Sequence, residues 1–288
     1  MRALRLLALI CGCLATPLSS FAADTSLFAR TNLVAWCIVP FDAKKRGPED
    51  RAAMMERLGI RRFAYDYRAE HVPQWDDELA ALKRHGISLD AWWFPTSMND
   101  EARRTLELFK RHNVSPQFWV SGGGAPVNSP EEQAARVDSE ARRIRPIADA
   151  AATVGSKVAL YNHGGWFGEP ENQIAIIERL RRDGVMNVGL VYNLHHGHDH
   201  LDRFPALLTK MKPHLLALNL NGMTKGGDKA GKKIMVLGQG DLDLALLKVI
   251  RDSGWRGPIG ILNHTDLDAE QRLRENLDGL DRLVQQLK

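Results

Sequence analysis

The chain has 288 residues, 44% of them hydrophobic and 26% charged, and its formal net charge is +4 at pH 7. This composition is ordinary for a folded globular protein and excludes a low-complexity or strongly charged disordered chain. The length fits one large α/β barrel or two smaller domains. After residue 22, no apolar run is long enough to span a bilayer, so we expect no transmembrane segment.

The first 22 residues predict a secretory signal peptide. Two arginines precede an apolar run at 6–15, and Ser20-Phe21-Ala22 before Ala23 fits a cleavage site. Cleavage would lower the net charge to about +2, which gives no reason to expect a nucleic-acid partner. It would also leave Cys37 as the only cysteine, which excludes an intrachain disulfide. We therefore expect an exported protein, periplasmic or secreted; a lipoprotein is the alternative, because residues 10–13 resemble a lipidation motif.

Eight strand–helix pairs can be placed along residues 23–288. The expected strands are 33–39, 62–65, 88–94, 116–120, 157–161, 187–192, 215–218 and 258–262. The expected helices begin near 48 and then cover 75–85, 100–112, 129–154, 170–183, 201–211, 242–253 and 269–287. Eight such units predict a single (β/α)8 TIM barrel, in preference to an open doubly wound sheet. The Gly- and Lys-rich connection 222–240 is unusually long, as functional loops often are.

Asparagines follow four successive strands, at the barrel end where ligands bind. Residues two apart in a strand point to the same face, and the residue two positions before each asparagine is small or aliphatic, as in a barrel core. We therefore expect the asparagines to line the barrel mouth and to bind substrate hydroxyls. The alternative is that they only cap strands and begin turns. The residues are Asn162, Asn193, Asn219 with Asn221, and Asn263.

Charged and aromatic residues extend this polar rim. Asp66, Arg68 and His71 follow the second strand, and Trp166 follows the fifth. An indole packs against the C–H face of a sugar while amides and imidazoles bind its hydroxyls, so Arg68 and Trp166 are candidate substrate-binding residues. For each tryptophan, packing in the core is the alternative.

The segment 195–200 contains four histidines and one aspartate. Alternating imidazoles on an extended loop can converge on zinc or a similar ion. His196, together with His163 and His264 after other strands, is therefore a candidate metal ligand. A merely solvated loop, with Asp199 as a helix N-cap, is the alternative.

This architecture and these strand ends resemble the xylose-isomerase-like TIM barrels, a superfamily of sugar isomerases, sugar epimerases and endonuclease IV. The resemblance implies a divalent metal held by a Glu after strand five, an Asp-x-x-His after strand six, a His after strand seven and a Glu after strand eight. The matching positions here are Asn162, Asn193 to His196, Asn219 and Asn263, and only His196 keeps its ligand type.

Neutral amides are poor ligands for a divalent cation, and Asn cannot carry a proton between adjacent carbons. The metal-assisted mechanism that the resemblance implies is therefore not transferred to this chain. Either His163, His196 and His264 with Asp66 rebuild a site for Zn or Mn, or no metal is bound. Both outcomes stay open at this point.

We therefore expect an exported carbohydrate-active protein of the sugar isomerase/epimerase type, with a His/Asn-rich pocket at the barrel mouth and a small sugar or sugar derivative as its partner. His196 or His264 would transfer the proton, and Asp66 or His163 would assist. One alternative is a non-catalytic sugar-binding protein on the same barrel. Another is a metal-independent glycoside hydrolase, which needs a pair of carboxylates. The sequence leaves the oligomeric state open.

Overall fold

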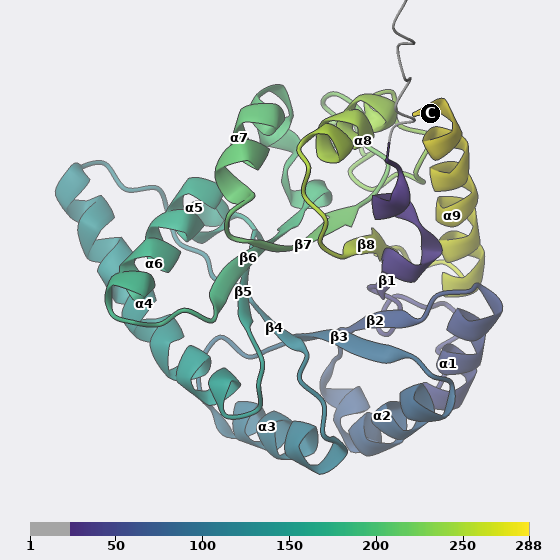
Figure 1. Ribbon diagram of the computed structural model, residues 1–288, viewed down its shortest axis with the longest axis horizontal. Helices are drawn as coiled ribbons and strands as arrows, with labels where there is room; N and C mark the ends of the chain where they lie inside the picture. Colours follow the sequence, from purple (N-terminus) through teal and green to yellow (C-terminus); the bar gives the residue numbers. More distant parts are fainter. Residues whose placement is uncertain (1–23, 288) are drawn as a thin grey trace, which may run out of the picture.

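Eight parallel strands close into a barrel in chain order in the computed structural model, which describes residues 24–287 (Figure 1). The expected signal peptide at 1–22, and the boundary of the barrel at Ala23, lie outside the described residues. The expectation of a (β/α)8 TIM barrel is confirmed. No helix within 24–287 is both long and apolar enough to cross a membrane.

The strands are short and most of their residues are buried, except in β3, where only Ala91 and Trp92 are. They are β1 Leu33–Trp36, β2 Arg62–Tyr65, β3 Ser88–Trp93, β4 Gln117–Val120, β5 Val158–Tyr161, β6 Val188–Asn193, β7 Leu215–Leu220 and β8 Ile259–Leu262. Closure is made by β1 against β8, which pair in parallel over four residues, from Leu33 with Ile259 to Trp36 with Leu262. Because every strand has two neighbours, no sheet edge is left exposed.

The helices form a ring outside the strands. The α-helices are α1 Pro48–Arg57, α2 Trp75–Arg84, α3 Asp100–His112, α4 Pro130–Ala152, α5 Gly165–Gly168, α6 Pro170–Arg182, α7 Phe204–Met211, α8 Asp243–Asp252 and α9 Ala269–Gln286. The 3-10 turns are η1 Ser26–Phe28, η2 Arg30–Asn32, η3 Ala69–Gln74, η4 Leu194–His196 and η5 His198–Arg203. Capping side chains determine where several helices begin. The Ser129 side chain, for example, accepts a hydrogen bond from the Glu132 amide at the start of α4.

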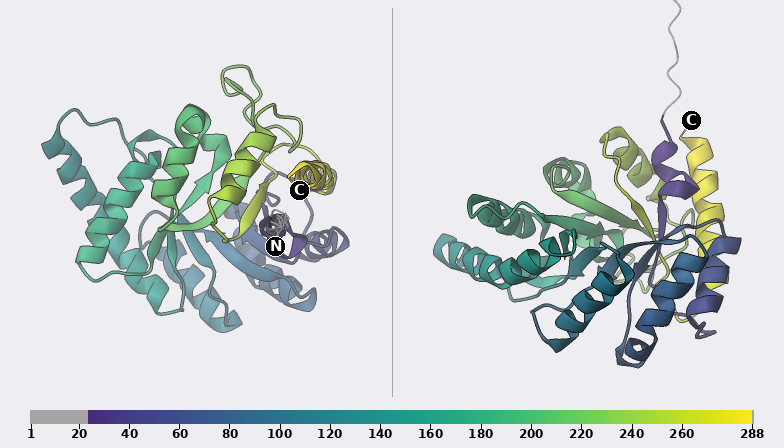
Figure 2. Two further views of the ribbon diagram at one scale, coloured as in Figure 1. Left: turned by 45° about the horizontal axis from the view of Figure 1, so that its top comes forward. Right: turned by 60° about the horizontal axis from the view of Figure 1, so that its bottom comes forward.

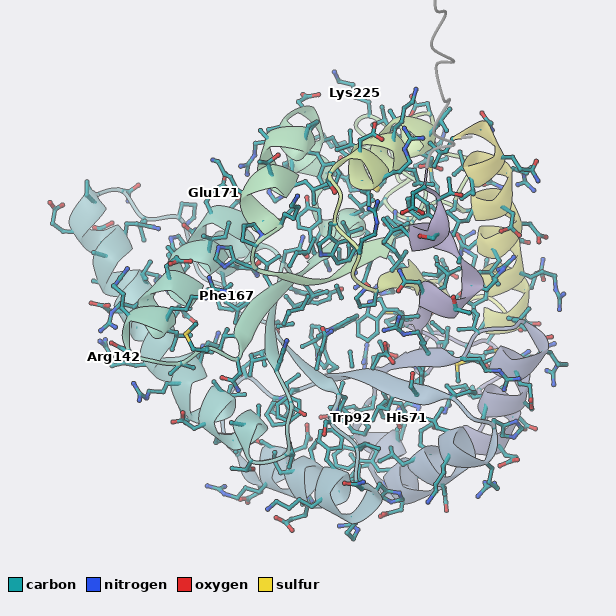
Figure 3. All side chains as sticks on the ribbon, in the orientation of Figure 1. His71, Trp92, Arg142, Phe167, Glu171 and Lys225 are labelled. Atoms are coloured by element: carbon teal, nitrogen blue, oxygen red, sulfur yellow. The ribbon has the colours of Figure 1, made fainter. Side chains whose placement is uncertain are left out.

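Two apolar layers hold this arrangement together. The larger layer lies between strands and helices; there Trp92 of β3, labelled in Figure 3, packs edge-on against Trp75 of α2 and Phe109 of α3. The smaller layer fills the barrel interior, where small residues such as Ala159 and Ala217 leave room for Trp36 and Trp119. These two indoles meet edge to face with centroids 4.7 Å apart.

The long connection between β7 and α8 projects beyond the strand ends on the mouth side, as the light-green loop in Figure 2 shows. A single antiparallel bridge between Gly222 and Met235 draws its two arms together. The Asp243 carboxylate accepts hydrogen bonds from the backbone N–H groups of Met223, Gly238 and Gly240, at 2.6 to 3.0 Å. The connection is therefore an ordered part of the mouth, tied to the first residue of α8.

Candidate functional site

A cavity of about 140 Å³ opens at the C-terminal ends of the strands. It is smaller than the ~300 Å³ at which drug-sized pockets begin, so it suits one small molecule. The lining residues come from six of the eight strand ends and the loops that follow them. They are Trp36, Cys37, Phe41, Asp66, Arg68, Trp93, Tyr161, His163, His195, His196 and His264.

The four candidate catalytic residues therefore lie together. Asp66, His163, His196 and His264 come from the ends of β2, β5, β6 and β8 and share one cavity, and Arg68 lies at the same place. Their roles in catalysis or metal binding stay predictions. His71 does not line this cavity; it follows in η3, where its Nδ1 accepts a hydrogen bond from the Arg68 amide.

Asp66 is the only carboxylate that lines the cavity. Its side chain is buried, at 3% exposure, and neither carboxylate oxygen has a hydrogen-bond partner within the described residues. Burial raises the pKa of Asp66 to about 7, and the positive charges of Arg68 and Arg51, its own backbone N–H and the adjacent Cys37 thiol oppose that rise. This carboxyl group can therefore both release and accept a proton near neutral pH.

The imidazoles form a cluster in the same cavity. Ring centroids are 4.6 Å apart for His163 and His196, 3.6 Å for His195 and His196, and 5.6 Å for His195 and His264. Burial, followed by the charges of His163 and Lys233, lowers the pKa of His196 to about 3. Burial also lowers the pKa of His163, His195 and His264. All four rings are therefore neutral at physiological pH, and each can donate one N–H.

Aromatic side chains form the walls. The ring of Trp93 meets Tyr161 edge-on at 5.0 Å and lies 6.2 Å from Trp36, and Phe41 lies 3.8 Å from His264. Sequence reasoning missed Phe41, Tyr161 and Cys37 as cavity residues. Tyr161 could have been found, because it shares strand parity with His163. Cys37 was expected to lie inside a strand, whereas β1 ends at Trp36 and Cys37 adopts the left-handed conformation, with φ 59°.

The asparagines do not line the cavity, and the expectation that they occupy equivalent, inward-facing positions at the four strand ends is wrong. Asn193 and Asn219 share parity with Val191 and Ala217, which belong to the barrel interior. Asn162 and Asn263 share parity with Leu160 and Ile261, which belong to the layer between strands and helices. The cavity residues at the ends of β5 and β8 are instead His163 and His264.

Most of these amide side chains form hydrogen bonds with backbone groups. Asn162 donates to the Asn193 carbonyl at 3.1 Å and accepts from the Asn193 amide at 2.7 Å. The Asn193 side chain donates to the Tyr161 hydroxyl and accepts from the His195 amide. Asn221 donates to the Lys233 carbonyl at 3.3 Å. Asn219 and Asn263 are buried without hydrogen-bond partners in the described residues. Their binding of substrate hydroxyls stays a prediction, and the structure brings none of them to the cavity.

Trp166 lies elsewhere, in α5 beside a second groove of about 390 Å³. Its Nε1 donates to the Gln133 side chain at 2.7 Å, and its backbone carbonyl accepts from the Asn172 amide group. The groove therefore has Trp166 as part of its wall, with the polar edge of the indole already occupied. The structure does not bring Trp166 together with the cavity residues.

The cavity residues do not fit a divalent metal. No group of three or more His, Cys, Asp or Glu side chains within residues 24–287 is arranged to hold an ion. The rings of His195 and His196 are in direct contact, with centroids 3.6 Å apart and planes tilted by 44°, whereas metal ligands direct their ring nitrogens at a shared centre. The interior-facing asparagines at the ends of β6 and β7 offer only neutral amides. The site thus supplies one carboxyl and four neutral imidazoles, a set suited to moving protons.

The hydrolase alternative lacks its second carboxylate. Glu169 is engaged outside the cavity by His200 and by Arg203, the latter at 2.8 Å. Asp266 is exposed and does not line the cavity. Glycoside hydrolysis needs two carboxyl groups on either side of the bond, so the geometry does not favour it.

Comparison with known proteins identifies the fold. The family model of the xylose isomerase-like TIM barrel matches residues 52–283. An apo structure of YcjR from E. coli, a 3-keto-D-glucoside 4-epimerase, is similar with a TM-score of 0.62 and 16% identity, covering 88% of this chain and 98% of that chain. The IOLI protein with zinc has a TM-score of 0.65 and 17% identity, covering 90% and 99%.

A third similar structure is the probable 3-DHS dehydratase AsbF from Bacillus anthracis, with a TM-score of 0.64, 13% identity and coverage of 87% and 99%. At these identities the likeness shows the shared fold. No curated protein matches the sequence.

Proposed function

Because the chain belongs to the xylose isomerase-like TIM barrel family, we propose that it is a sugar isomerase or epimerase that transfers protons with Asp66 and without a metal. The observation that carries this proposal is the buried, unpartnered Asp66 carboxyl inside a cavity that it shares with four imidazoles. A buried charge or polar group is normally paired, so an unpaired one in a cavity indicates a ligand or a reaction.

Isomerisation by this site needs one base and one donor. The Asp66 carboxylate takes the proton from the carbon next to the sugar carbonyl, and the C–H electron pair forms the C=C bond of an enediol. A neutral imidazole gives its proton to the carbonyl oxygen and regains one from the neighbouring hydroxyl, which becomes the new carbonyl. Asp66 then returns its proton to the former carbonyl carbon. Epimerisation needs a second donor: an imidazole on the other face of the enediol protonates the original carbon, the enediol O–H proton returns to the first imidazole as the carbonyl re-forms, and Asp66 passes the proton it took to solvent, from which the second imidazole is reprotonated.

The walls suit a sugar. Trp36 and Trp93 present apolar ring surface to C–H groups, and the imidazole N–H groups are placed for hydroxyl and carbonyl oxygens. The small cavity volume suits a single sugar unit. One structural neighbour is itself a 3-keto-D-glucoside 4-epimerase, which agrees with this substrate class.

We also propose that the protein is exported, on the strength of the signal-peptide pattern at residues 1–22. The intact mass of protein recovered from a secretion-competent host should correspond to a chain that begins at Ala23. A mass equal to that of the full 288-residue chain would rule out the cleavage.

A turnover screen tests the enzyme. The purified protein is incubated with aldoses, ketoses and keto-sugars, and NMR is used to detect isomers or epimers. We expect turnover by the wild type, a loss of at least ~100-fold in Asp66→Asn because the base is removed, and wild-type rates in the exposed control Asp202→Asn. Binding of a sugar with no product in the wild type would instead support the non-catalytic sugar-binding protein.

A further inference from the structure

Two cationic side chains, one lining the cavity and one on the neighbouring β7–α8 connection, have no carboxylate partner within residues 24–287. Arg68 lines the cavity, with its guanidinium 5.3 Å above the Phe41 ring and one N–H donated to the Tyr67 carbonyl at 2.7 Å. Lys233 lies on the β7–α8 connection and is exposed. Neither residue forms an ion pair in the described part of the chain. An unpaired guanidinium at a small cavity is a ready partner for a carboxylate or phosphate.

The position of Lys233 is fixed from several sides. Its backbone carbonyl accepts hydrogen bonds from His198 Nε2 at 2.9 Å and from Asn221 at 3.3 Å. The next residue, Ile234, packs against the barrel-interior cluster, and its carbonyl accepts from Arg272 at 3.4 Å. The connection thus folds inward at Lys233, whereas Lys225, labelled in Figure 3, lies at its outer end.

The positive charge of Lys233 acts on the histidines of the cavity. Burial is the main cause that lowers the pKa of His163, His195 and His196, and the charge of Lys233 lowers all three further. For His264 the order is burial, the charge of Arg68 and then Lys233, against the opposing charge of Asp266. Two acids face this group of charges: Asp66 is buried in the cavity wall, and Asp266 is exposed and acts on His264. Residues 222–240 themselves carry four lysines and one aspartate.

We propose that the substrate is an anionic sugar, whose carboxylate or phosphate group is bound at the mouth by Arg68 and Lys233. The inference rests on the proposed function for the choice of a sugar. Asp66 and the imidazoles face the reacting carbons at the inner end of the cavity, and the two cations neutralise the charged end of the substrate. Pairing of the anion with two cations would also make affinity depend on salt, because screening shortens the range of their attraction.

Equilibrium binding measured by calorimetry tests the inference without requiring turnover. The purified protein is titrated at low ionic strength with glucose, glucuronate, glucose 6-phosphate and inorganic phosphate. We expect glucuronate or glucose 6-phosphate to bind at least ~10-fold more tightly than glucose, and the preferred anion identifies the charged group. Lys233→Gln should weaken that ligand about tenfold, whereas Lys232→Gln, an exposed neighbour on the same connection, should not.

Equal affinity for glucose and both anionic sugars, or no effect of Lys233→Gln, would overturn the inference. Inorganic phosphate that binds as tightly as glucose 6-phosphate would also overturn it, because the sugar would then contribute nothing. If the anionic sugars bind as expected but no sugar is turned over, the proposed enzyme fails while this inference stands.

Discussion

At Asp66 the protein keeps an ionisable group where ionisation is unfavourable. The pKa of this carboxyl is about 7 in the folded chain, against a value of 3.8 for an unperturbed aspartate. The unfolded chain therefore loses its proton at lower pH than the folded chain does. Between these two values the folded state binds more protons, so this residue makes the free energy of unfolding fall as pH rises.

Substitution of Asp66 by Asn should remove this pH dependence. At pH 4 the wild type and Asp66→Asn should have similar free energies of unfolding, because the folded carboxyl is then neutral and pH 4 is close to the value of 3.8 at which the unfolded chain begins to lose this proton. At pH 8 the variant should be more stable by up to about 4 kcal/mol, since each pKa unit corresponds to about 1.4 kcal/mol. Urea denaturation at both pH values measures the difference.

The same comparison with Asp202→Asn provides the control, because this side chain is 92% exposed and does not line the cavity. A gap between wild type and Asp66→Asn that stays constant from pH 4 to pH 8 would mean that Asp66 ionises as an ordinary carboxyl. Its role as a base tuned to neutral pH would then have no support.

The sequence identified Asp66, His163, His196 and His264 as candidates, but it could not rank them. Ranking needed the burial of Asp66 and the absence of a partner for it, both of which depend on residues far apart in the chain. The direction in which the asparagine side chains point was predicted wrongly for a different reason. Strand side chains alternate between faces, and Asn162 and Asn263 directly follow the interior-facing Tyr161 and Leu262, so they point toward the helix layer.

At the scale of elements, the β7–α8 connection depends on Asp243. This carboxylate accepts three backbone N–H groups, from Met223, Gly238 and Gly240, and is itself 1% exposed. Burial raises its pKa to about 6 against the opposing effect of these three donors. It is therefore mostly ionised at neutral pH, when it holds together the two arms of the connection that carries Lys233.

Asp243→Asn should loosen this connection. The amide keeps one acceptor oxygen but turns an NH₂ group toward a backbone donor, and each buried N–H left without a partner costs about 1–3 kcal/mol. Hydrogen exchange, followed by mass spectrometry, should show faster exchange across residues 222–240 and unchanged exchange in the strands. Asp241→Asn, an exposed neighbour, is the matched control.

Uniform acceleration across the whole chain would contradict this assignment, because it would indicate global destabilisation. Unchanged exchange in 222–240 would show that the Gly222–Met235 bridge and the packing of Ile234 are sufficient to order the connection.

Most elements could be predicted from local chemistry. The helix α3 has the predicted bounds because Asn99 caps its start and Asn113 ends it in the left-handed conformation. The histidine-rich loop could not be predicted, because η4 and η5 are short 3-10 turns without a helical apolar pattern. They delay the start of α7 to Phe204.

At the scale of the whole molecule, contacts across the β1–β8 seam complete the barrel. The largely buried Arg46 side chain bridges Asp42, in the connection after β1, to Asp268 before α9, at 2.8 and 2.7 Å. At the other end, Arg30 pairs with Asp281. Alternating strand and helix patterns predicted eight units, but only the paired ends of the chain show that the sheet closes.

The central claim is that this barrel moves sugar protons through Asp66 without a metal. Its most direct test is deuterium incorporation from D₂O into the carbon-bound positions of sugars, before and after the protein is treated with a chelator. The account predicts exchange next to the carbonyl that survives chelation and is lost in Asp66→Asn. Exchange that disappears on chelation and returns with Zn or Mn would contradict it.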